Sequence, residues 1–244
     1  VRDVAFWSAL VVIFAYGWTA NARNVDYMSD ERMWFDTVQK QPRNARARNN
    51  YASNLLKTGQ AKAAAEHLQV AVDESPNFAE AHANLGIALD TLGLHHDALV
   101  HFERALAINP FYTSVFENLG EAYRAENQPA KAAKYFLKAL DQKPDDVALL
   151  NKAAWILATA IDPVARDGAR AIVLAQHAVD LTERHDASSL DTLAAAFAES
   201  GRFGDAMTVG TEAVALARAR GDRQFDVELE QRLSLYRAKK PFRQ

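Results

Sequence analysis

The sequence contains no cysteine and few glycines, ten in 244 residues. Without cysteine the chain has no disulfide bond, no thiolate metal site and no thiol nucleophile. Its formal net charge is −3, so a nucleic-acid partner attracted by a broad basic surface is not expected. The sequence also lacks a glycine-rich phosphate loop, a serine-centred elbow and a zinc-protease motif. We therefore expect no cofactor, no bound metal and no enzymatic activity from this chain.

What the sequence has in abundance is alanine and other good helix formers. Hydrophobic residues make up 49% of the chain, and Ala, Leu, Glu, Lys, Gln and Arg all favour helix over sheet. This composition predicts an all-α fold.

A single uncharged stretch stands near the start, from Val4 to Ala22. Its apolar part of about 17 residues is close to the minimum that crosses a bilayer, and aromatic residues stand near both of its ends, as at membrane interfaces. We predict a membrane-spanning segment within residues 1–24, with the membrane contacted through residues 4–22. The alternatives are a cleaved signal peptide, with Ala20-Asn21-Ala22 as its processing site, and a buried core helix.

Four prolines stand 34 residues apart and reveal an internal repeat: Pro42, Pro76, Pro110 and Pro144. The period predicts five helix–turn–helix units over residues 45–220, namely 45–78, 79–112, 113–146, 147–186 with an enlarged inner turn, and 187–220. Residues 25–44 are predicted to form a linker and a lone repeat-like helix. Residues 221–244 are predicted to form a helix that caps the last apolar face of the array.

Within each unit, small residues recur where two helices must approach closely, at Ala52, Gly86 and Gly120. Each inner turn carries a residue suited to the left-handed conformation, at Gly59, Gly93 and Asn127. This spacing and residue set resemble the tetratricopeptide repeat. The resemblance implies a right-handed α-solenoid that binds protein segments on its concave face.

The uncharged segment followed by "TANARNVDYMSDERMWFDTVQKQPRNARARNNYASNLLKTG" resembles the junction in transmembrane-and-tetratricopeptide-repeat proteins, relatives of protein O-mannosyltransferases. This resemblance implies a membrane protein whose repeats lie on the non-cytoplasmic side. The chain would then be the substrate-capturing or regulatory domain of a polytopic glycosyltransferase. The alternative is a single-span, membrane-anchored assembly scaffold.

An asparagine recurs at the sixth position of the first three units, at Asn50, Asn84 and Asn118. Asparagine in a helix interior costs up to about 0.7 kcal/mol relative to alanine. An amide that grips the backbone of an extended peptide would explain its use, and a bond to a neighbouring helix is the alternative. In the repeat family this position lines the concave groove, where we place further candidates: Asn49, Ser53, Glu80, Glu117, Glu121, Asn151 and Trp155.

These groove candidates carry more acid than base, which favours a neutral or basic peptide. Trp155 either stacks on that ligand or covers the enlarged turn at 161–168. His95, His96 and His101 are interpreted as surface residues, because their spacing does not suit a metal. Arg166 and Asp167 are interpreted as a local, solvated pair. The function predicted from the sequence is a protein-interaction module.

Overall fold

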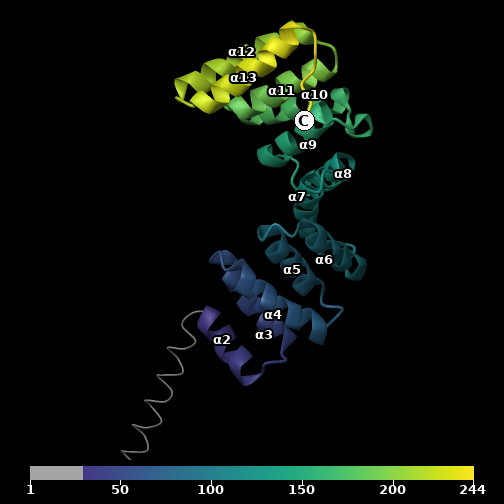
Figure 1. Ribbon diagram of the computed structural model, residues 1–244, viewed down its shortest axis with the longest axis vertical. Helices are drawn as coiled ribbons and strands as arrows, with labels where there is room; N and C mark the ends of the chain where they lie inside the picture. The colour runs from purple at the N-terminus through teal and green to yellow at the C-terminus, as the bar shows by residue number, and fades with distance from the viewer. Residues whose placement is uncertain (1–29) are drawn as a thin grey trace, which may run out of the picture. The chain divides into compact units, whose positions relative to one another are not determined.

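The computed structural model describes residues 30–244, and the predicted all-α fold is confirmed (Figure 1). This part of the chain contains twelve α-helices, two short 3₁₀ turns and no strand. Among its helices, none combines the length and the apolar character needed to cross a membrane. The membrane segment predicted at 4–22 lies outside the described residues.

The chain divides into two compact units between Pro110 and Phe111. The first unit contains α2 (Asp30–Lys40), α3 (Ala45–Lys57), α4 (Ala61–Glu74), α5 (Ala79–Thr91) and α6 (His95–Ile108). The second contains η1 (Thr113–Val115), α7 (Phe116–Ala125), α8 (Pro129–Leu140), α9 (Val147–Thr159), η2 (Pro163–Ala165), α10 (Gly168–Leu181), α11 (Ala187–Glu199), α12 (Phe203–Ala219) and α13 (Arg223–Arg237).

Each unit is a stack of helical hairpins. In the first unit α3 pairs with α4 and α5 with α6, and α2 packs against α3. In the second unit α7 pairs with α8, α9 with α10 and α11 with α12, while α13 packs on α12. The first helices of neighbouring hairpins also touch, as α3 touches α5 and α9 touches α11. One face of each stack is therefore built from first helices alone.

The inner turns close as the sequence predicts. Gly59 and Gly93 have φ values of 77° and 78°, and Asn127 has a φ of 53°. These left-handed conformations end the first helix of each hairpin at no steric cost for glycine and little cost for asparagine. The prediction for these three turn residues is confirmed.

Small residues allow the two helices of a hairpin to approach closely. A Cβ atom on Gly86 would lie 2.5 Å from Cε1 of the Phe102 ring, and one on Gly120 would lie 2.6 Å from Cδ1 of Phe136. Both rings are completely buried. Each phenylalanine therefore fills the space that the glycine of its own hairpin leaves open.

The enlarged turn between α9 and α10 is held by its own polar groups. The Asp167 side chain accepts a hydrogen bond from the backbone N–H of Arg170 and caps α10. Arg166 does not pair with Asp167. Its guanidinium donates to the carbonyls of Ala160 and Ile161, at 3.0 and 2.8 Å, and to Glu199 on α11. The expected local pair is therefore wrong, because the turn aims the two side chains at different partners.

The predicted cap over residues 221–244 is a helix only as far as Arg237. Lys239 has a φ of 56°, its N–H bonds the carbonyl of Tyr236, and the N–H of Lys240 bonds that of Leu235. These two bonds form a Schellman motif, and Pro241 follows it. Residues 238–244, which we name the return segment, then run back to the end of α9, where Figure 1 marks the chain end.

Candidate functional site

Four of the predicted groove residues meet in the first unit, on α3 and at the start of α5. Asn84 Nδ2 donates to Asn49 Oδ1 at 2.8 Å. Asn49 Nδ2 in turn lies 3.2 Å from Glu80 Oε1 and 3.3 Å from Asn50 Oδ1. Asn49 is completely buried, so it links neighbouring helices from within, and the other three side chains lie nearer the surface. Ser53 lies half-buried one turn further along α3.

The bond from Asn84 to Asn49 spans 35 residues, from position 6 of one repeat to position 5 of the repeat before it. The same offset of 35 separates Lys152 from Glu117, whose Nζ and Oε1 atoms are 3.0 Å apart. Position 6 thus ties successive first helices together. Asn118, half-buried on α7, has Ala83 at the corresponding earlier position, which offers no polar group.

A cluster of paired charges lies on α7 and α9. Lys152 Nζ is 2.8 Å from Glu121 Oε1, and Arg124 Nε is 2.9 Å from Glu121 Oε2. Burial by itself would raise the pKa of Glu121, but the hydrogen bonds from Lys152 and Arg124 outweigh it and lower that pKa. In this cluster Glu117 and Glu121 therefore each have a cationic partner.

A buried ion pair joins α11 to α13. Arg232 Nε donates to Asp191 Oδ1 at 3.0 Å, and Arg232 Nη2 lies 3.0 Å from Asp191 Oδ2. Burial raises the pKa of Asp191 to about 6, against the opposing charge of Arg232. The sequence offered a signal for Arg232, since it lies beside the apolar stripe of Leu229 and Leu233 on the capping helix. We did not predict it as a site residue.

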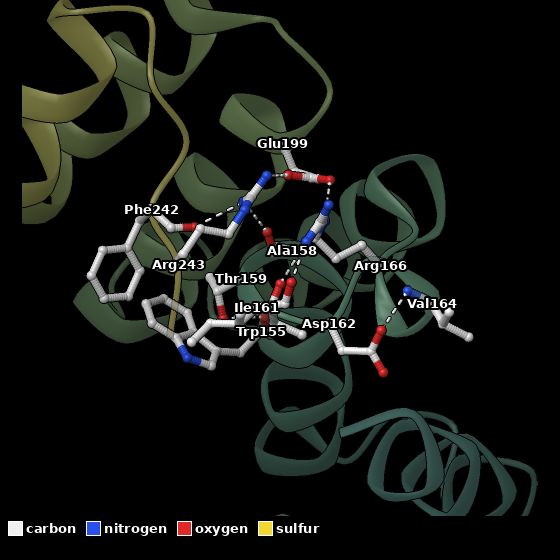
Figure 2. Close-up of polar contacts among 11 residues, drawn as sticks. Trp155, Ala158, Thr159, Ile161, Asp162, Val164, Arg166, Glu199, Phe242 and Arg243 are labelled. Atoms are coloured by element: carbon white, nitrogen blue, oxygen red, sulfur yellow. Dashed lines mark hydrogen bonds and ion pairs between the residues drawn. The ribbon is translucent and has the colours of Figure 1, made fainter. Parts of the chain in front are cut away.

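Trp155 packs against Phe242 of the chain's own return segment (Figure 2). The Trp155 and Phe242 ring centroids are 5.8 Å apart, with 49° between the ring planes. The Arg232 guanidinium lies 5.4 Å from the centroid of each ring, within the range of a cation–π contact. One turn before Trp155, Asn151 Nδ2 donates to Ser189 Oγ on α11 at 2.8 Å.

The end of α9 is an electronegative site occupied by two arginines (Figure 2). The last carbonyls of a helix have no partner within it and carry its negative dipole. Here the carbonyl of Ala158 accepts from Arg243 Nη1 at 3.3 Å, and that of Thr159 accepts from the N–H of Gln244 at 2.8 Å. Glu199 adds a carboxylate that bonds both Arg166 and Arg243.

Sequence reasoning missed this arrangement. Glu199 pairs with Arg166 and Arg243 across 33 and 44 residues, and neither offset belongs to the repeat period. No pattern along the chain marks these residues as neighbours.

Two cavities flank the return segment in the second unit. One of about 440 Å³ lies over α7, α9, α11 and α13, and its lining includes three predicted groove residues: Glu121, Asn151 and Trp155. The other, of about 620 Å³, lies beside the enlarged turn and is lined by Arg124, Lys131, Ile161 and Asp162, among others. Trp155 and Gln244 border both cavities, so Gln244 of the return segment lies between two open spaces.

The predicted surface histidines lie on α6. His95 Nδ1 is 2.7 Å from Asp90 Oδ1, and His101 Nδ1 is 3.0 Å from His82 Nδ1. His96 is exposed. From residue 30 onward, no group of three or more His, Cys, Asp or Glu side chains is placed to hold a metal ion.

Models of the tetratricopeptide repeat match residues 36–79, 79–112 and 114–146. The chain contains tetratricopeptide repeats. Solved repeat structures support this fold: YrrB, described as having an unusual peptide-binding site, superposes with a TM-score of 0.70 and 16% identity over 81% of this chain and 97% of its own. MamA of Desulfovibrio magneticus RS-1 gives 0.61 and 19% over 72% and 96%.

Curated relatives match only in part. Tetratricopeptide repeat protein 6 of Homo sapiens is 29% identical over 117 residues, which are 48% of this chain and 22% of that protein. Superkiller protein 3 of Schizosaccharomyces pombe is 38% identical over 65 residues, 27% of this chain and 5% of that protein. The chain thus spans less than a quarter of each. The family models and solved structures confirm the predicted repeat, and none of these comparisons supports the context of protein O-mannosyltransferase relatives.

Proposed function

We propose that this tetratricopeptide-repeat chain is a binding module, without catalysis of its own, that holds an extended segment of a partner protein. The cavity of about 440 Å³ over α7, α9 and α11 carries the proposal. Three side chains predicted to line a groove border it, together with the Phe225 ring and the ion pair of Asp191 and Arg232. A cleft lined by aromatic rings and by paired charges suits an extended peptide.

The paired charges make a neutral segment, bonded through its backbone, a better occupant than a highly charged one. Glu121, Lys152 and Asp191 are already engaged in ion pairs, so a ligand charge would have to displace a partner of opposite sign. Asn118 on α7 has no amide or carboxylate at the position 35 residues earlier, and we propose it as a further peptide contact. The reported peptide-binding site of YrrB supports this general mode.

The test is selection of decapeptides from a random display library on the full chain, followed by affinity measurement by fluorescence anisotropy. Trp155→Ala should weaken the selected peptides at least tenfold, because it removes the aromatic floor of the cleft. Trp34→Ala is the matched control, since Trp34 is also half-buried but lies on α2 in the other unit. Equal effects of the two variants would refute the proposal.

The membrane alternatives stay predictions. Residues 4–22 lie outside the described part of the chain, and none of the relatives named above addresses a glycosyltransferase context or a non-cytoplasmic location. The upstream reading frame would decide between them, since several hydrophobic spans should precede Val1 if the chain belongs to a polytopic enzyme.

A further inference from the structure

We infer that the end of α9 is a recognition site for a protein segment in which an aromatic residue is followed by arginine, and that the return segment is an intramolecular copy of that ligand. This inference rests on the proposed function and names the class of segment that is bound. The arginine of that segment contacts Glu199 and the end of α9, which lie outside the lining of the cleft with the paired charges. It is carried by the way residues 242–244 lie on α9, which resembles a bound peptide more than a helix cap.

Trp155 and Arg232 form the part of the site that binds the aromatic residue of the segment. The Phe242 ring packs against the Trp155 indole with centroids 5.8 Å apart, and the Arg232 guanidinium lies 5.4 Å from the centroid of each ring. Asp191 holds Arg232 in place through two contacts of 3.0 Å. A flat, polarised floor of this kind accepts any aromatic side chain.

The end of α9 and Glu199 form the part of the site that binds the arginine of the segment. The Arg243 guanidinium bonds Glu199 and the Ala158 carbonyl, and these acceptors belong to two different helices, α11 and α9. The Glu199 side chain is 14% exposed, so its attraction for a cation is screened less than that of a surface carboxylate. Lysine would reach one of these acceptors, whereas the arginine fork reaches both.

The next residue is held through its backbone alone. The N–H of Gln244 donates to the Thr159 carbonyl at 2.8 Å, a contact that any residue except proline can make. The site therefore binds three consecutive residues, through one aromatic side chain, one guanidinium and one backbone N–H. This is the pattern of an extended peptide whose side chains give specificity and whose main chain adds affinity.

The return segment is attached in a way that permits its replacement. It follows the left-handed residue Lys239 and Pro241, its Phe242 and Arg243 side chains are only half-buried, and open cavities flank it. An intramolecular ligand on a short connection has an effective concentration of about millimolar. A partner segment of equal intrinsic affinity therefore displaces it only at about millimolar concentration, and a segment of higher intrinsic affinity displaces it at a proportionally lower concentration.

The experiment uses the full chain and the amidated peptide Lys-Pro-Phe-Arg-Gln, which copies residues 240–244 and carries a fluorophore at its N-terminus. Phe242→Ala with Arg243→Ala opens the site. We expect saturable binding of the peptide to this opened variant and at least tenfold weaker binding to the wild type. Glu199→Gln in the opened variant should weaken binding at least tenfold, and Glu212→Gln should not, because Glu212 pairs with Arg184 at the surface.

Several results would overturn the inference. Failure of the peptide to bind the opened variant, with helical content unchanged by circular dichroism, would make the return segment a fixed cap. If the double variant loses helical content, Arg243→Ala alone is used, with the same expectation. Equal affinity of the peptide for the wild type and for the opened variant would show that the return segment does not compete for the site. A wild-type dimer that dissociates in the opened variant would assign the segment to a second copy.

The library selection separates this inference from the proposed function. Selected peptides that need Trp155 but lack an aromatic–arginine pair would refute the inference and leave the proposed function standing. A library that yields no peptide on either the wild type or the opened variant would refute both.

Discussion

Replacing Asn84 with alanine should destabilise the first unit, although alanine is the better helix former. The substitution removes the amide that donates to Asn49 Oδ1, and Asn49 is completely buried. Leaving a buried acceptor without its donor costs about 1–3 kcal/mol, against a gain in helix propensity of up to about 0.7 kcal/mol. The expected net loss is about 0.5–2 kcal/mol.

Asn118→Ala is the matched control, with the same substitution at the same repeat position. Its counterpart 35 residues earlier is Ala83. The substitution therefore does not leave a side-chain amide at that position without a hydrogen-bond donor. The variant should be neutral or more stable by up to about 0.7 kcal/mol. The sequence alone would predict this outcome for Asn84 as well, and the difference between the two positions tests the structure.

The assay is amide hydrogen exchange by mass spectrometry on the full chain, because a repeat array need not unfold in one step. Peptides from α3 and α5 should exchange roughly 2- to 30-fold faster in the Asn84→Ala variant. Exchange in α11 and α12 serves as the internal reference. Unchanged protection of α3 and α5, or an equal loss in the Asn118→Ala variant, would refute the bridging role of Asn84.

Two further predictions concern stability. Gly86→Ala should lower the free energy of unfolding in urea by about 1–3 kcal/mol, because its Cβ would lie 2.5 Å from the Phe102 ring. Adding Phe102→Leu to this variant should recover part of the loss. Gly204→Ala is the control and should show no loss, because there is open space at its Cβ. Burial raises the pKa of Asp191 to about 6, so the folded chain binds the extra proton between about pH 4 and 6. The contribution of this proton to the free energy of unfolding is full below about pH 4 and is lost as the pH rises through 6. Asp191→Asn should therefore gain about 2–3 kcal/mol of unfolding free energy relative to wild type between pH 4 and 7. A difference that stays constant over this pH range would contradict the burial argument.

The sequence by itself determined the fold class and the local structure of the repeats. Both follow from interactions that are short in sequence. Glycine at 59 and 93 takes a left-handed turn because no side chain opposes it, and the 34-residue proline period marks the first units because each repeat contacts mainly its neighbours. The tetratricopeptide repeat was therefore recognisable from residue spacing. The resemblance to that family then placed Glu121, Asn151 and Trp155 on one face, and all three border the same cavity.

Only the tertiary structure decided what the side chains on that face do. Asn49 and Asn84 carry the same amide, yet the packing of α3 on α5 buries one completely and leaves the other half-buried. The return segment reaches α9 because the chain reverses after α13, and Glu199 meets Arg243 across 44 residues that no repeat period relates. Burial and long-range approach set the dielectric and the partners of each polar group, and neither is encoded in residue type or spacing along the chain.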